Sequence, residues 1–117
     1  MVIYKGRSNL KITKVKYMAK LFLTSGLVLN VNPVKNKKSF SYEELRIFVE
    51  GMVEIVPLPS GKSIIVNEEG KCIGLPKNEK ATEYWKEEYP IEKYPDNNDE
   101  LIVGNALVAT DEELGDL

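Results

Sequence analysis

Residues 41–66 read SYEELRIFVEGMVEIVPLPSGKSIIV, and this stretch decides the fold class because a helix pattern runs directly into two strand patterns. Ser41 followed by Glu44 is a capping box at the start of a helix. The apolar positions at helical spacing are Leu45, Phe48, Val49 and Met52. Gly51 is predicted to take the left-handed conformation that often ends a helix.

Two strands are predicted after this helix, over residues 52–58 and 63–66, with a turn at Pro59-Ser60-Gly61. Both faces of 52–58 are largely apolar, which predicts a central strand that is buried on both sides. Residues 67–70, Asn-Glu-Glu-Gly, have the composition of a hairpin loop. A returning strand over 71–75 would complete a three-stranded meander.

The flanking sequence adds a hairpin before this unit and a helix and strand after it. Residues 20–24 and 27–31 are predicted to pair around a Ser25-Gly26 turn. Asn78 is predicted to cap a second helix over 79–88, and residues 101–109 form a final strand with a bulge or close backbone approach at Gly104. The predicted fold class is therefore α+β, with a small, mostly antiparallel sheet in the order β-hairpin, helix, three-stranded meander, helix, final strand.

The length of 117 residues and the hydrophobic content of 43% fit one domain with its own core. Residues 1–17 contain five basic residues and no acidic one, and we interpret them as a basic arm or an upstream extension, with an edge strand as the alternative. The single α+β domain spans 18–110, and 111–117 is an acidic tail that is expected to fray. From Met18 onward, 11 basic residues face 18 acidic ones, a net charge of −7 that disfavours a general nucleic-acid-binding surface.

The location predicted for the chain is the cytoplasm of a host cell. Its one cysteine cannot form an internal disulfide, and the sequence lacks an apolar run long enough to span a membrane. We therefore expect no membrane association.

The absence of histidine excludes histidine-dependent catalytic triads and metal sites. No catalytic residue, metal or cofactor is expected, and the chain is predicted not to be an enzyme. Cys72 is interpreted as a small buried side chain within a strand. Glu54 is the carboxylate of most interest, and it either faces water near an edge or pairs with Lys62 across the hairpin.

One block of the sequence carries a family resemblance. Residues 66–71, VNEEGK, and 74–82, GLPKNEKAT, resemble the family called domain of unknown function 3846. Two flanking blocks also resemble it: residues 41–51, which lead into 54–56, and residues 102–108. The similarity runs from about Met18 to Val108 and includes no catalytic signature to transfer. It implies a protein of phages and other mobile elements, with a usual start near Met18.

Three functions are compatible with these observations. The first is a non-enzymatic phage or mobile-element accessory protein that binds a host protein, such as a component of a defence system. The alternative is a nucleotide-ligand or single-stranded nucleic-acid binder that acts as a homo-oligomer, suggested by the basic arm and the lysines within 35–38. The third is an enzyme that uses only carboxylate, lysine or tyrosine groups. The exposed edge of the 20–31 hairpin could also join two copies in a homodimer.

Any functional surface is expected at the loop 67–70 and the crossover 75–78. The candidate binding residues are Asn67, Glu68, Glu69, Gly70, Leu75, Pro76, Asn78 and Trp85. Each of these segments also has a structural explanation, as a turn or a helix cap. Trp85, with Tyr84 and Tyr89, is either a stacking platform for bases or part of the core.

Overall fold

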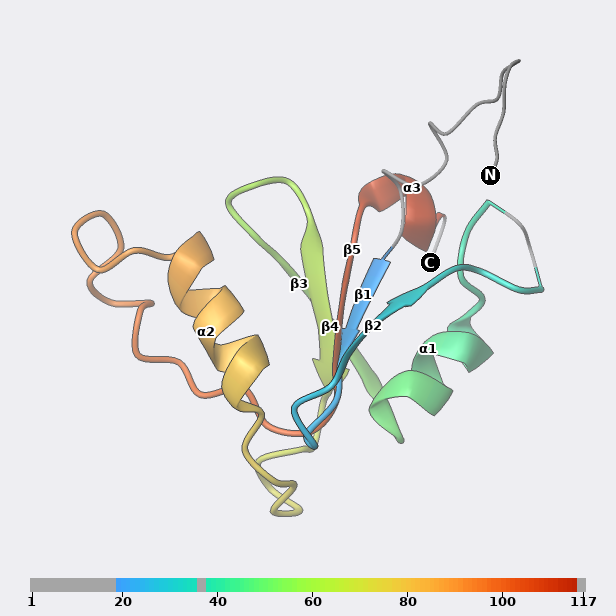
Figure 1. Ribbon diagram of the computed structural model, residues 1–117, viewed down its shortest axis with the longest axis horizontal. Helices are drawn as coiled ribbons and strands as arrows, with labels where there is room; N and C mark the ends of the chain where they lie inside the picture. Colours follow the sequence, from blue (N-terminus) through green and yellow to red (C-terminus); the bar gives the residue numbers. More distant parts are fainter. Residues whose placement is uncertain (1–18, 36–37, 116–117) are drawn as a thin grey trace, which may run out of the picture.

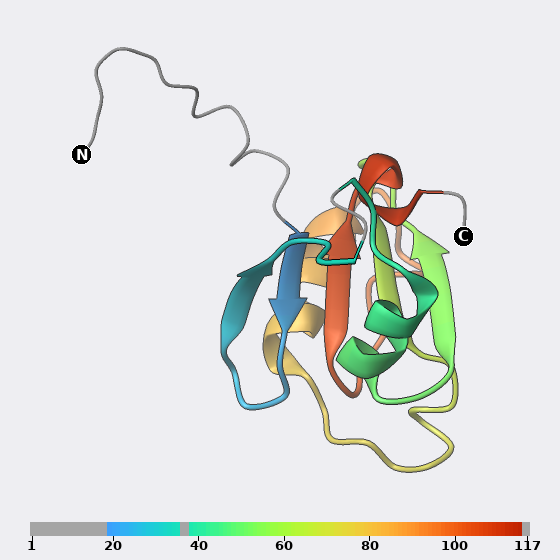
Figure 2. The same ribbon diagram turned by 90° about the vertical axis from the view of Figure 1, so that its right-hand side faces the viewer.

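The computed structural model describes residues 19–35 and 38–115, and within these ranges five strands form one antiparallel sheet. In chain order the elements are β1 (Ala19–Phe22), β2 (Val28–Val31), α1 (Tyr42–Val49), β3 (Val53–Pro57), β4 (Ser63–Asn67), α2 (Glu79–Glu88), β5 (Ala106–Ala109) and α3 (Asp111–Leu114). The sheet order is β2-β1-β5-β4-β3, so the last strand of the chain lies at the centre (Figure 2). The predicted α+β class is confirmed.

Helices α1 and α2 cover opposite faces of the sheet (Figure 1). Successive residues of a strand point to opposite faces, and all four residues of β5 are buried because both faces of this strand are covered. The buried side chains on the α1 face are Ala19, Leu21, Phe40, Leu45, Val49, Ile65, Leu107, Ala109 and Leu114. Those on the α2 face are Phe22, Leu58, Ile64, Ala81, Trp85, Ile102, Ala106 and Val108.

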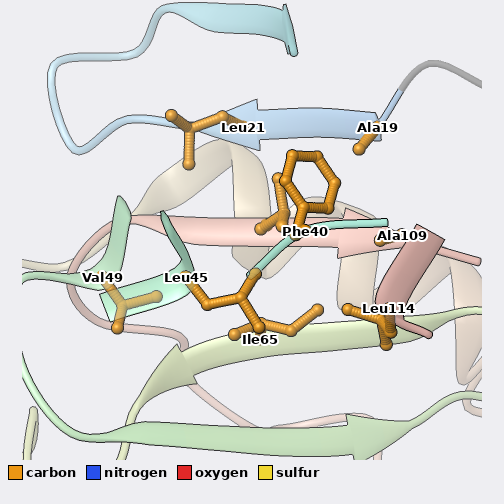
Figure 3. Close-up of a cluster of buried hydrophobic side chains, with 9 residues drawn as sticks. Ala19, Leu21, Phe40, Leu45, Val49, Ile65, Ala109 and Leu114 are labelled. Atoms are coloured by element: carbon orange, nitrogen blue, oxygen red, sulfur yellow. The ribbon is translucent and has the colours of Figure 1, made fainter. Parts of the chain in front are cut away.

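Phe40 occupies the middle of the α1-face core, between the sheet and the two helices α1 and α3 (Figure 3). It is 2% exposed and makes an edge-to-face contact with Phe48, with ring centroids 5.7 Å apart. Its backbone N–H donates to the carbonyl oxygen of Glu113 at 2.7 Å. The loop before α1 is thereby attached to the end of the described chain.

The predicted hairpin and capping box are both confirmed. β1 and β2 pair antiparallel around a turn in which Gly26 has a φ of 101°. Ser41 caps α1 by accepting from the backbone N–H of Glu44, while the Glu44 carboxylate accepts from the N–H of Ser41. The prediction for Gly51 was wrong, because Glu50 is the left-handed residue, with a φ of 63°.

Gly51 is constrained by space instead of by its φ angle. A Cβ atom at this position would lie 2.5 Å from Nδ2 of Asn67. That amide donates to the carbonyl oxygens of Val49 and Glu50 at the end of α1. Glycine at 51 therefore lets the buried Asn67 hold the end of the helix against β4.

The charge of Glu44 is expected to make the stability of α1 depend on pH. Burial raises the pKa of this carboxyl, but hydrogen bonds from the backbone of Ser41 and Val34 outweigh that effect and hold its pKa below the ordinary value of 4.5. A lowered pKa in the folded state means that the stabilisation is complete above pH 4.5 and is lost as pH falls through the lower folded value.

We therefore expect Glu44→Gln to lower the free energy of unfolding at pH 7 by about 1 kcal/mol, a figure kept small because the site is partly exposed to solvent. The difference from the unmodified protein should shrink at pH 3. Urea denaturation at both pH values measures it. A difference that is equal at the two pH values would show that the carboxylate charge contributes nothing.

The prediction that residues 52–58 form a central strand was wrong. Among the described strands, β3 pairs only with β4 and is an edge of the sheet, and Ile55 on its α1 face is 40% exposed. β5 follows β4 in the chain only after the crossover and α2, yet it enters between β1 and β4 and takes the central place. The apolar residues of β3 therefore lie at a boundary of the core.

The predicted third strand of the meander, 71–75, was also wrong. Residues 68–74 form turns, and the crossover that follows runs antiparallel to residues 102–104 instead of joining β4. Gly104 N–H donates to the carbonyl oxygen of Pro76, and Asn78 N–H donates to that of Ile102, both at 2.8 Å. The predicted strand 101–109 is accordingly divided: 102–104 contacts the crossover and only 106–109 joins the sheet.

The segment after Thr110 was expected to fray, and this was wrong for residues 111–115. Thr110 caps α3 through a second capping box with Glu113, and Leu114 is buried in the α1-face core. The arm at 1–17 lies outside the described residues, so its interpretation stays a prediction. No helix in the described part of the chain is long and apolar enough to cross a membrane.

Candidate binding site

A pocket of about 300 Å³ opens on the α2 face of the sheet, beside the edge strand β3. Its lining residues come from β3, from β4 and the turn after it, from α2, and from the segment before β5. They are Glu54, Val56, Ile64, Val66, Asn67, Glu68, Lys71, Cys72, Trp85, Glu100, Leu101, Ile102 and Val103. Segments from four parts of the sequence thus meet at one site.

Strand alternation explains the inner wall of the pocket. Glu54 lies opposite Val66 in the β3–β4 register, and Val56 lies opposite Ile64. All four residues therefore point to the same face of the sheet. Three of them are apolar and one is a carboxylate, so the sheet supplies an apolar wall with an acidic group near its open edge.

The outer wall depends on hydrogen bonds between α2 and the loop that follows it, which lie on the same side of the sheet (Figure 1). The indole Nε1–H of Trp85 donates to the carbonyl oxygen of Asn97 at 2.7 Å. Thr82 Oγ1 accepts from the backbone N–H of Ile102 at 3.0 Å and donates to the carbonyl oxygen of Asn78. These bonds set the position of residues 97–102 beside the indole.

The aromatic residues of α2 pack mainly against one another and the core. Trp85 is 7% exposed and contacts Tyr89, with ring centroids 4.5 Å apart, and Tyr89 in turn contacts Tyr94. Burial and a hydrogen bond to Glu88 raise the pKa of Tyr84 above its ordinary value of 10.0, so this hydroxyl remains a hydrogen-bond donor to Glu88 beyond the pH at which a free tyrosine ionises. The core interpretation of Trp85 is confirmed, although one part of the indole still lines the pocket.

The rim of the pocket is acidic. Glu54, Glu68 and Glu100 line it together with one basic residue, Lys71, whose ammonium group is paired with the Glu100 carboxylate. Among the described residues, neither Glu54 nor Glu68 has an ion-pair partner. As far as the described residues show, the site therefore carries two formal negative charges without a neutralising group, next to an apolar wall.

Three of the candidate binding residues, Asn67, Glu68 and Trp85, line this pocket. The side chain of Asn67 is directed to the end of α1, as described above, and it also accepts from the N–H of Glu69 at 2.8 Å. Glu69, Gly70, Leu75, Pro76 and Asn78 do not line the pocket. Their contacts are those of turn and crossover packing.

Packing accounts for the two glycines near the crossover. A Cβ at Gly70 would lie 3.1 Å from Cγ2 of Val103, and one at Gly104 would lie 2.8 Å from Cδ1 of Leu75. Gly104 also has a φ of 75°, which disfavours other residues. The close backbone approach predicted at Gly104 is confirmed, and it places Val103 at the pocket.

Cys72 differs from its prediction, since it is exposed in a turn at the pocket and not buried in a strand. Glu54 is exposed on the edge strand, which matches the expectation that it faces water and not the pairing with Lys62. Lys71 and residues 100–103 were missed. A local pattern could not have found them because they meet through a tertiary contact and not through strand pairing.

The geometry defines a small α+β domain with an acidic, partly apolar pocket beside β3 and, within the described residues, no cluster of side chains suited to a metal ion. A family model described as a domain of unknown function (DUF3846) matches residues 24–117. The chain belongs to this family. A search of the curated proteins and a search of the solved structures each found no match to the chain.

Proposed function

We propose that this domain is a non-enzymatic binding protein that engages a host protein through the pocket beside β3. The observation that carries the proposal is the composition of the pocket, in which an apolar wall adjoins carboxylates that lack partners among the described residues. Apolar surface supplies affinity and a few charged groups supply specificity in such sites. The setting implied by the family resemblance, phages and other mobile elements, makes a host defence protein the first partner to test.

A nucleotide or single-stranded nucleic acid fits this pocket less well. Phosphate groups would face Glu54 and Glu68, while the one lysine of the lining is already paired. Of the lysines in the loop 35–38, Lys35 is paired with Glu43 at 2.8 Å. A retained nucleotide is therefore an outcome that would overturn the proposal.

The unique cysteine gives a direct test, because Cys72 is exposed at the pocket and no other thiol is present. The purified protein is immobilised with and without a bulky maleimide on Cys72 and exposed to lysate of the cell in which it is naturally made. We expect a host protein that the untreated domain retains and that the labelled domain retains at least about tenfold less, a loss of roughly 1.4 kcal/mol.

Cys72→Ser treated with the same maleimide is the matched control, and it should retain the partner like the untreated protein. Mass spectrometry identifies the retained protein and any small molecule released by heating. Retention that is unaffected by the label, absence of any retained protein, or release of a nucleotide would each contradict the proposal.

A further inference from the structure

We propose that the pocket accepts an arginine side chain presented by the partner protein. This inference rests on the proposed function and adds the chemistry that the site recognises. It begins from charge: Glu54 and Glu68 lack ion-pair partners within the described residues, and Lys71 is held by Glu100. A cation is thus the complement of the rim, whereas an anion is repelled by it.

The size and lining of the pocket favour one long side chain. A volume of about 300 Å³ is at the lower end of ligand pockets, where a single side chain fits better than a nucleotide. Val56 and Val66, which are partly exposed, form an apolar wall that can cover a methylene stem while the charged end reaches the rim, and Ile64 beside them is buried in the α2-face core. Since β3 is an edge strand, no other described strand lies alongside it to block the approach of a partner.

Arginine suits these groups better than lysine. Its guanidinium group is less strongly hydrated than an ammonium group and binds carboxylates in a bidentate manner. It also interacts favourably with an aromatic ring, and Trp85 is part of the lining. A lysine ammonium would have to lose more hydration at a site whose wall is apolar.

The unique tryptophan provides the measurement, because Trp85 is the only indole in the chain and it lines the pocket. Its fluorescence is followed while the domain is titrated with acetyl-Gly-Arg-Gly-amide, and with the same peptide carrying lysine or citrulline. Citrulline has nearly the shape of arginine without its charge. We expect an arginine-peptide Kd on the order of 1 mM, at least about fivefold weaker binding of the lysine peptide and at least about tenfold weaker binding of the citrulline peptide.

Charge-removing variants locate the binding. Glu54→Gln and Glu68→Gln should each weaken arginine-peptide binding about fivefold to tenfold. Glu83→Gln is the matched control, because Glu83 is exposed on α2 but does not line the pocket, and this variant should bind like the unmodified protein. All three positions are exposed, so the variants are expected to fold, and urea denaturation checks that they do.

The inference is overturned if the citrulline peptide binds as well as the arginine peptide, if Glu54→Gln has no more effect than Glu83→Gln, or if 10 mM arginine peptide, about ten times the expected Kd, leaves the fluorescence unchanged. These results are distinguishable from failure of the proposed function. A host protein that depends on the open pocket, but that is captured without any arginine preference, would leave the binding function standing and remove only the arginine assignment.

Discussion

Asn78→Ala is expected to lower the free energy of unfolding by about 4 kcal/mol, a large part of the stability of a domain of this size. Asn78 is 1% exposed, and its side chain makes three hydrogen bonds. Oδ1 accepts from the N–H of Ala81 at 3.0 Å, while Nδ2 donates to the carbonyl oxygens of Phe22 at 2.9 Å and Gly104 at 2.8 Å. Alanine would leave three buried backbone groups without these partners.

Asn78→Ser separates the two roles of this side chain. The serine hydroxyl can still cap α2, but it is too short to replace the amide donor toward both carbonyl groups. We expect Asn78→Ser to be more stable than Asn78→Ala by about 1 kcal/mol, the usual contribution of an N-cap. Urea denaturation of the three proteins measures both differences. A loss below about 1.5 kcal/mol in Asn78→Ala would mean that water replaces the missing partners.

Leu45→Ala is expected to be the second large effect, with a loss of about 3 kcal/mol. Leu45 is fully buried in the α1-face core, where it packs with Phe40 and Ile65 (Figure 3). Truncation removes apolar contacts and leaves a cavity that the surrounding sheet fills only in part.

Ile47→Ala, two residues further along the same helix, is the matched control. Ile47 is 74% exposed, so its truncation should change the unfolding free energy by no more than about 0.5 kcal/mol. Alanine also favours a helix more than isoleucine does, which works in the stabilising direction. Similar losses in the two variants would contradict the assignment of the Leu45 effect to burial, because helix propensity favours alanine at both positions.

Local signals in the sequence were sufficient to predict the features that depend on contacts between residues close in the chain. The Ser41–Glu44 capping box, the Asn78 cap and the Ser25-Gly26 hairpin were all predictable, because each needs contacts within a few residues. The second capping box at Thr110 and Glu113 has the same chemistry. It was overlooked because the acidic composition after Thr110 suggested a frayed end.

The candidate site was predictable only in part. Asn67, Glu68 and Trp85 were named among the binding candidates and do line the pocket, and Glu54 was recognised as the unusual carboxylate. Lys71 and Glu100, whose side chains meet across the site, are 29 positions apart. The false strand at 71–75 had placed the lysine in the sheet, so its ion pair could not be foreseen.

The sequence by itself determined helices α1 and α2, their N-caps, the Ser25-Gly26 turn and the α+β class, because these follow from side-chain periodicity and from hydrogen bonds between residues close in the chain. Only the tertiary structure decided which strand is central. Residues 53–57, apart from Glu54, and residues 106–109 are both apolar, yet among the described strands β5 lies between β1 and β4 while β3 is left at the edge. Strand order depends on how α1 and α2 cover the two opposite faces of the sheet. The pocket lies beside β3 because no other described strand pairs with the outer side of β3.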